Sequence, residues 1–230
     1  AQISSDWEVL VAGCSHCIGP GQPYGAGVRF VHKVYFSRNN SEWKEVWNHT
    51  STESYSFSFF RNAAETFPTY SVSSDGSRLG ISSVGQAATF YDINKISGKV
   101  TPLNVDIQAK NVTRLSFSHD GNTVAVATAE WKCVFDPFYL YRRRNFCQQF
   151  SRLGNLNVYE FISERQIWVQ KGRQMRGSLT DRPLENVDLS ADGKTVAVYQ
   201  RQHSLRTSVW YATQWVQVFS FRKNLQPGIN

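Results

Sequence analysis

Apolar and polar residues alternate along short segments of this chain, which is the period expected of half-buried β-strands. The clearest example spans residues 115–117 and 123–127, Leu-Ser-Phe and Thr-Val-Ala-Val-Ala. Between them stands Ser118-His119-Asp120-Gly121, and Asp-Gly favours a tight turn because glycine adopts a positive φ without steric cost. The pattern predicts two antiparallel strands joined by a short hairpin turn.

The same pattern recurs, which identifies the chain as a repeat protein. Residues 70–72 and 78–81 flank Ser73-Ser74-Asp75-Gly76, and residues 187–189 and 195–198 flank Ser190-Ala191-Asp192-Gly193. A degraded fourth copy opens the chain, where Ser4-Ser5-Asp6-Trp7 precedes residues 9–12. In that copy Trp7 stands where the other three have glycine.

Further alternating segments rich in β-branched and aromatic residues follow each hairpin and predict more strands. Third strands are expected at 31–36, 88–93, 156–161 and 215–221, and fourth strands at 43–47, 98–103 and 166–171. Only residues 222–230 follow the last third strand, so the fourth copy is expected to lack its fourth strand.

Repeated units of four antiparallel strands predict an all-β fold, a β-propeller of about four blades that is incomplete or closed by its termini. We expect one domain, 1–230, with blades at roughly 1–50, 66–107, 112–172 and 184–230. The four turn aspartates lie 69, 45 and 72 residues apart, whereas a blade needs about 40–45 residues. Two blades therefore carry insertions, and the main one is expected at 131–154.

The turn motif and the strand after it, Ser190-Ala191-Asp192-Gly193-Lys194-Thr195-Val196-Ala197-Val198, resemble the blades of WD40-like β-propellers. Together with residues 157–161 and 168–170, the motif is similar to tandem repeats of secreted algal and diatom propeller proteins. The Gly-His and Trp-Asp pairs of true WD40 repeats are missing from the sequence. The resemblance implies a propeller fold and leaves the function open, because one fold serves many functions.

Basic residues gather in segments that are expected to be long loops on one face of the propeller. The chain has 25 Lys and Arg against 18 Asp and Glu, a net charge of +7. The expected loops are 13–27, 129–154 and 200–213, joined by the blade connection 172–184. They carry the candidate partner-binding residues Lys132, Tyr139, Tyr141, Arg142, Arg143, Arg144, Arg173, Arg176, Arg201 and Arg206.

A basic face with aromatic residues suits an anionic partner, because the arginine fork binds two oxygens of a carboxylate, sulfate or phosphate. The alternative is that the aromatic residues of 131–154 form a small core of their own, with the arginines solvated around it. The two interpretations are compatible.

The chain has four cysteines, Cys14, Cys17, Cys133 and Cys147. A zinc site would need a second closely spaced pair, which 133 and 147 do not form. We therefore expect disulfides and no metal: Cys133 with Cys147, and Cys14 with Cys17 or with the other pair. Together with a first residue other than Met, this favours a secreted or organelle-lumen protein, the plastid lumen included.

No catalytic motif stands out, and a calcium loop would need more oxygens than one Asp beside a Gly, so the turn aspartates are expected to cap their turns. We interpret the chain as a non-enzymatic binding or scaffold module without a cofactor. Its expected partner is an acidic protein surface, an anionic polysaccharide or subunits of a membrane complex; nucleic acid is disfavoured. The alternative is a glycan-active enzyme with its site at the propeller channel. No apolar stretch is long enough for a membrane-spanning helix.

Overall fold

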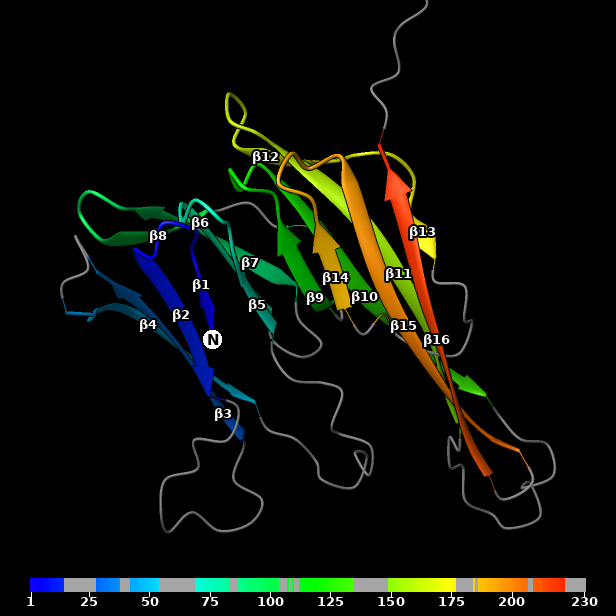
Figure 1. Ribbon diagram of the computed structural model, residues 1–230. Helices are drawn as coiled ribbons and strands as arrows, with labels where there is room; N and C mark the ends of the chain where they lie inside the picture. Colours follow the sequence, from blue (N-terminus) through cyan, green and yellow to red (C-terminus); the bar gives the residue numbers. More distant parts are fainter. Residues whose placement is uncertain are drawn as a thin grey trace, which may run out of the picture.

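The computed structural model contains β-strands and no helix among the residues that it describes. These residues are 1–14, 28–37, 42–53, 69–82, 87–103, 107, 109, 112–134, 149–176, 184, 186–206 and 209–221. The strands form four antiparallel sheets, here called blades 1 to 4 (Figure 1). The all-β class is as the sequence predicts.

Each of the first three blades has four strands in sequence order. Blade 1 consists of β1 (Gln2–Ile3), β2 (Val9–Cys14), β3 (Val28–Phe36) and β4 (Lys44–Glu53). Blade 2 consists of β5 (Thr69–Val72), β6 (Arg78–Ser82), β7 (Ala88–Asn94) and β8 (Lys99–Leu103). Blade 3 consists of β9 (Val112–Phe117), β10 (Thr123–Val134), β11 (Gln149–Ile162) and β12 (Ile167–Gln170), and β13 (Met175–Arg176) pairs with β11 farther along.

Blade 4 has three strands among the described residues: β14 (Asn186–Leu189), β15 (Thr195–Arg206) and β16 (Val209–Ser220). The four hairpins and the third strands lie where the alternating pattern predicts them. Residues 222–230, which follow β16, lie outside the described residues, so the expected lack of a fourth strand in the last copy stays a prediction.

The blades stack face to face in chain order, because strand residues alternate between the two faces of a sheet. Val9, Val11 and Val34 of blade 1 pack against Leu79 and Ile81 of blade 2. Phe90 of blade 2 packs against Leu115, Phe117, Val124 and Val126 of blade 3. Ala125, Ala127, Leu156 and Val158 of blade 3 pack against Val187, Val196 and Val198 of blade 4.

Blades 1 and 4 lie at opposite ends of the stack (Figure 1). The molecule is therefore an open arc of propeller blades, whose two middle blades bury both of their faces. Among the described residues, no further sheet packs on the outer face of blade 1 or on the outer face of blade 4.

Two stretches that the sequence predicts as long loops, 129–154 and 200–213, are strands as far as the structure describes them, and residues 135–148 and 207–208 lie outside the described residues. Residues 131–134 and 149–154 belong to β10 and β11, which pair in register as far as Val134 and Gln149. Residues 201–206 and 209–213 belong to β15 and β16, which pair as far as Arg206 and Val209. The aromatic and β-branched residues that suggested a loop with its own core also favour extended backbone, and here they lengthen the hairpins.

Candidate functional site

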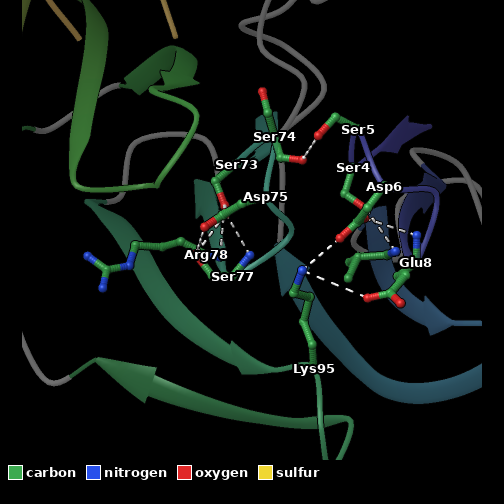
Figure 2. A network of polar contacts seen from close by, with 11 residues as sticks. Ser4, Ser5, Asp6, Glu8, Ser73, Ser74, Asp75, Ser77, Arg78 and Lys95 are labelled. Atoms are coloured by element: carbon green, nitrogen blue, oxygen red, sulfur yellow. Dashed lines mark hydrogen bonds and ion pairs between the residues drawn. The ribbon is translucent and has the colours of Figure 1, made fainter. Parts of the chain in front are cut away.

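At one end of each blade, a hairpin turn joins the first strand to the second. In blade 2 the Ser73 hydroxyl donates to Asp75 Oδ1 (2.6 Å) and accepts the Arg78 N–H (2.9 Å) (Figure 2). The same Asp75 oxygen accepts the Ser77 N–H (2.9 Å), and the Gly76 N–H donates to the Ser73 carbonyl (2.9 Å). Two side chains thus satisfy the backbone donors that the turn exposes.

The other three turns repeat this arrangement. The serine hydroxyl donates to the aspartate over 2.5 Å at Ser4–Asp6, 2.6 Å at Ser118–Asp120 and 2.7 Å at Ser190–Asp192. Gly76, Gly121 and Gly193 have φ values of 72°, 66° and 64°, and Trp7 takes the same left-handed conformation with a φ of 62°. The expected capping role of Asp75, Asp120 and Asp192 is confirmed.

Hydrogen bonding lowers the pKa of three of these carboxyl groups. Partial burial alone would raise the pKa of Asp6, but hydrogen bonds from Lys95, Ser4 and the Glu8 N–H outweigh it. Asp120 follows the same balance with Ser118 and Asn122 as donors, so its pKa is also lowered. The pKa of the exposed Asp192 is lowered chiefly by its hydrogen bond from Ser190.

Backbone hydrogen bonds join the turns of neighbouring blades into one seam. The Ser5 N–H donates to the Ser74 carbonyl (2.6 Å), Asp75 N–H to the His119 carbonyl (2.9 Å), and His119 N–H to the Ala191 carbonyl (2.9 Å). On the same face Lys95 contacts Asp6 Oδ2 at 2.7 Å and Glu8 Oε2 at 3.8 Å (Figure 2). This end of the blades holds the arc together, and its aspartates are occupied by internal partners.

Close approach at the seam requires glycine in the turn. A Cβ on Gly121 would lie 2.7 Å from the Arg78 Cβ, and one on Gly193 would lie 2.8 Å from the Thr123 Cβ. A Cβ on Gly76 would lie 2.8 Å from Val9 Cγ2. Each glycine is therefore needed for two reasons: its φ is positive, and a Cβ there would collide with the preceding blade.

Arg78 forms a buried cationic contact between blades 2 and 3. Arg78 is 9% exposed, and its Nε lies 3.1 Å from Asp92 Oδ1. Its guanidinium carbon lies 4.2 Å from the centre of the Phe161 ring and 5.7 Å from that of Trp168. Sequence analysis missed this contact, and its only signal was a charged residue at the position that is threonine in blades 3 and 4.

Two histidines pair across strands where blade 1 meets blade 2. His32 on β3 stands directly opposite His49 on β4, with ring centres 6.5 Å apart. Tyr70 of blade 2 packs edge-on against His32 at 5.3 Å, and Trp47 stacks on His49 at 5.8 Å. Burial, together with repulsion from His49, lowers the pKa of His32 to about 4, and burial lowers the pKa of His49.

Both histidines are therefore neutral at pH 7, and His32 is only 2% exposed. Their sequence signal was slight, because cross-strand pairing depends on a register that the sequence does not state. In the described part of the chain, no three or more His, Cys, Asp and Glu side chains are arranged to hold a metal ion. That same part contains no helix with the length and apolar character needed to cross a lipid bilayer.

The far ends of the hairpins hold several of the predicted partner-binding residues. Lys132 stands opposite Ser151 in the hairpin β10–β11, and Arg201 and Arg206 stand opposite Gln214 and Val209 in β15–β16. Arg176 pairs with Asn155 on the edge of β11, and both Arg173 and Arg176 are exposed. The structure thus places these five on blades 3 and 4, and Tyr139, Tyr141, Arg142, Arg143 and Arg144 lie outside the described residues.

Basic residues are concentrated in two stretches of the sequence, 131–154 and 200–213. These stretches hold one acidic residue, Asp136, against seven basic ones: Lys132, Arg142, Arg143, Arg144, Arg152, Arg201 and Arg206. The chain as a whole has 25 Lys and Arg against 18 Asp and Glu.

The disulfides stay a prediction. Cys17 and Cys147 lie outside the described residues, and Cys14 and Cys133 are placed only by their backbone, at the end of β2 and near the end of β10.

No protein-family model matches the chain, and comparison with curated proteins gives no match. Among solved structures, the chain is similar to the β-propeller domain of Cps50 (Swd1) from Myceliophteria thermophila, with 10% identity and a TM-score of 0.43 over 95% of this chain and 58% of that one. The periplasmic gluconolactonase of Pseudomonas aeruginosa has 16% identity and a TM-score of 0.41 over 83% and 46%. The complex of KlAtg21 with the coiled coil of AgAtg16 has 12% identity and a TM-score of 0.41 over 86% and 64%.

The chain thus spans less than two thirds of each of these structures. These likenesses concern the fold alone, and the propeller assignment rests on the strand order and blade stacking described above. The resemblance to algal and diatom repeats stays a prediction.

Proposed function

We propose that the chain is a non-enzymatic interaction module that binds an acidic protein surface through the far ends of the hairpins β10–β11 and β15–β16, here called the basic hairpin ends. The observation that carries this proposal is the length of these hairpins. Strands β10, β11, β15 and β16 have 12, 14, 12 and 12 residues, whereas β9 and β14 beside them have six and four. The longer strands continue past their neighbours on the side of the blades away from the Asp-Gly turns (Figure 1).

The charge of these ends supports an anionic partner. The projecting strand segments, 130–134, 149–154, 201–206 and 209–213, contain one acidic residue, Glu130. They contain four basic residues: Lys132, Arg152, Arg201 and Arg206. Arg142, Arg143 and Arg144 belong to the sequence that links β10 to β11. Asp136 is the one acidic residue in the sequence stretches 131–154 and 200–213, so their basic residues would create a local positive potential.

An acidic protein surface is the partner that we favour. Arginine outnumbers lysine among the candidate residues, and its planar fork forms two parallel hydrogen bonds with a carboxylate. Strand pairing fixes the backbone positions of Lys132, Arg201 and Arg206 along the two hairpins, which favours one arrangement of carboxylates over another. A secreted or lumenal location stays a prediction, as does the alternative of a glycan-active enzyme.

Binding to immobilised polyglutamate tests the proposal. Wild-type chain is expected to bind at low salt, with affinity falling as ionic strength rises through the range that screens surface charges. The charge reversals Arg201→Glu and Arg206→Glu together are expected to weaken binding at least about tenfold, since each removes an attraction and adds a repulsion.

Lys44→Glu and Lys99→Glu supply the matched control, because these exposed lysines stand on β4 and β8, away from the basic hairpin ends. The control pair should change the affinity less than about twofold. Equal losses in the two pairs would show attraction by net charge alone and overturn the proposal. Tight binding to heparin without binding to polyglutamate would replace the acidic protein with a sulfated polysaccharide.

A further inference from the structure

The strand β4 contains an acceptor motif for N-linked glycosylation. Asn48-His49-Thr50 is an Asn-X-Thr sequence in which the middle residue is not proline. Two further sequences of this type, Asn39-Asn40-Ser41 and Asn111-Val112-Thr113, occur in the chain. Such short motifs also arise by chance, so the surroundings of each asparagine decide whether it can carry a glycan.

Asn48 lies on the outer face of blade 1. It stands directly opposite Lys33 on β3, whereas His32 and Val34 on either side of Lys33 are buried against blade 2. Because side chains alternate between the two faces of a sheet, Lys33 and Asn48 point away from blade 2. Both Asn48 and Thr50 are exposed. Among the described residues no sheet packs on this face, so a branched oligosaccharide has room there.

The hydrogen bond that orients the Asn48 amide is compatible with glycosylation. The amide nitrogen Nδ2 carries two hydrogens, and Glu45 Oε1 accepts one of them over 3.1 Å. Glu45 Oε2 contacts Lys33 Nζ at 2.6 Å, which holds the carboxylate in place. Glycosylation replaces one amide hydrogen and leaves the other, so the hydrogen bond to Glu45 can persist in the modified protein.

The other two motifs offer no comparable acceptor among the described residues. Their asparagines lie outside the part of the chain that the structure describes. Val112 and Thr113 begin the inner strand β9, which packs between β5 and β14. Val112 is 5% exposed, and the Thr113 hydroxyl donates to the Ala127 carbonyl over 3.3 Å. Asn48 is therefore the motif asparagine whose exposure the structure shows.

We propose that Asn48 carries an N-linked oligosaccharide, attached when the chain enters an export compartment. The proposal rests on the predicted secreted or lumenal location and is independent of the basic hairpin ends. The donor is an oligosaccharide linked through a diphosphate to a lipid. In the transfer, the bond between the anomeric carbon and the diphosphate oxygen breaks, that carbon bonds to Asn48 Nδ2, and the amide loses one proton. The lipid diphosphate leaves with the electron pair of the broken bond.

A glycan at this position would protect an exposed strand edge. In the described sheet of blade 1, β4 stands at the edge and is 10 residues long. An unprotected edge strand can pair with another chain, and a bulky polar group beside it hinders that approach. The glycan would also keep a further sheet from stacking on the outer face of blade 1.

Peptide mass spectrometry of the native protein tests the proposal. Trypsin cuts after lysine and arginine, so the three motifs fall in separate peptides, 39–44, 45–61 and 111–114. Peptide-N-glycosidase converts a glycosylated asparagine to aspartate, and in heavy-oxygen water it labels that residue with the isotope. We expect the label at Asn48 in the peptide 45–61. A peptide 45–61 that carries no glycan in the native protein would overturn the proposal.

Variants of the full chain, secreted from a eukaryotic host, assign the glycan to this motif. Asn48→Gln and Thr50→Ala should lose the glycan and the mass that it adds. Thr50→Ser is the matched control, because serine keeps the hydroxyl of the motif, and it should retain the glycan. Both positions are exposed, and circular dichroism checks that each variant stays folded. Complete loss in Thr50→Ser, or an added mass that is unchanged in Asn48→Gln, would overturn the proposal.

Discussion

The guanidinium carbon of Arg78 in blade 2 lies 4.2 Å from the centre of the Phe161 ring in blade 3. The two residues come from neighbouring sheets and are 83 positions apart in the chain. Arg78 is almost fully buried there, so its attraction to the ring is weakened little by water. The contact ties the second strand of one blade to the third strand of the next.

A double-mutant cycle between Arg78→Met and Phe161→Leu should show a favourable coupling of about 1 kcal/mol in the free energy of unfolding. Both substitutions keep apolar volume and remove the cation or the ring. Urea denaturation of the four proteins gives the coupling. A second cycle between Arg78→Met and Val187→Ala, at the junction of blades 3 and 4, should show coupling below about 0.5 kcal/mol. Equal coupling in the two cycles would contradict a direct contact.

Ser118→Ala should lower the free energy of unfolding by about 2 kcal/mol, because the buried hydroxyl both donates to Asp120 and accepts the Thr123 N–H. Thermal and urea unfolding measure the loss. Ser163→Ala, in an exposed turn of blade 3, should change stability by less than about 0.5 kcal/mol. A similar small effect at Ser118 would show that water replaces the hydroxyl in the turn.

Gly121→Ala should destabilise the fold by about 3 kcal/mol, through its left-handed backbone and its approach to the Arg78 Cβ. Gly98→Ala separates the two causes, since Gly98 has a φ of 69° but its Cβ would lie 3.3 Å from the nearest atom, Val46 Cγ1. We expect about 1 kcal/mol there, for the backbone conformation alone. Equal losses of stability in Gly121→Ala and Gly98→Ala would mean that neighbouring blades can move apart to accommodate the added Cβ.

Stability should fall as the pH drops from about 6.5 toward 4, because the folded state holds His32 with its pKa lowered to about 4. The unfolded chain binds a proton at His32 below about pH 6.5 and the folded chain does not, so acid favours unfolding. The expected loss between pH 7 and pH 4.5 is about 2 kcal/mol, measured by urea denaturation at each pH.

His32→Gln serves as the control for this pH dependence and should remove most of the loss above pH 4.5. The lowered pKa of His49 acts in the same direction and accounts for a smaller remainder. The turn aspartates Asp6, Asp120 and Asp192 also have lowered pKa values, but they destabilise the fold only once the pH falls below their ordinary range near 4. An unchanged slope in His32→Gln would assign the acid sensitivity to another group.

Local chemistry explains what the sequence predicted well. Asp75-Gly76, Asp120-Gly121 and Asp192-Gly193 determine their turns by short-range hydrogen bonds and by glycine at positive φ, and the alternating strands beside them can be recognised without a structure. The fold class follows from repeating that unit. Even Trp7 was placed correctly in a turn, because Ser4 and Asp6 preserve the rest of the motif.

Long-range arrangement explains what the sequence did not predict. The extension of β10 past residue 130 and of β15 past residue 200 depends on a partner strand that continues beside each one, and charged and aromatic residues there looked like loop sequence. The pairing of His32 with His49, and the place of Arg78 over Phe161, depend on strand register and blade stacking. None of these contacts leaves a local pattern in the sequence.

The contacts between neighbouring turns limit how whole blades could be added to this chain or removed from it. Duplicates of the second, third or fourth sheet could be inserted in series, since each brings a turn without a side chain where its predecessor must fit. A duplicate of the first sheet is expected only at the start of the series, because Trp7 has a Cβ where the other turns have glycine close to the preceding sheet. The residue at one turn position, Trp7 in blade 1 and glycine in the other blades, therefore determines which blade can follow another.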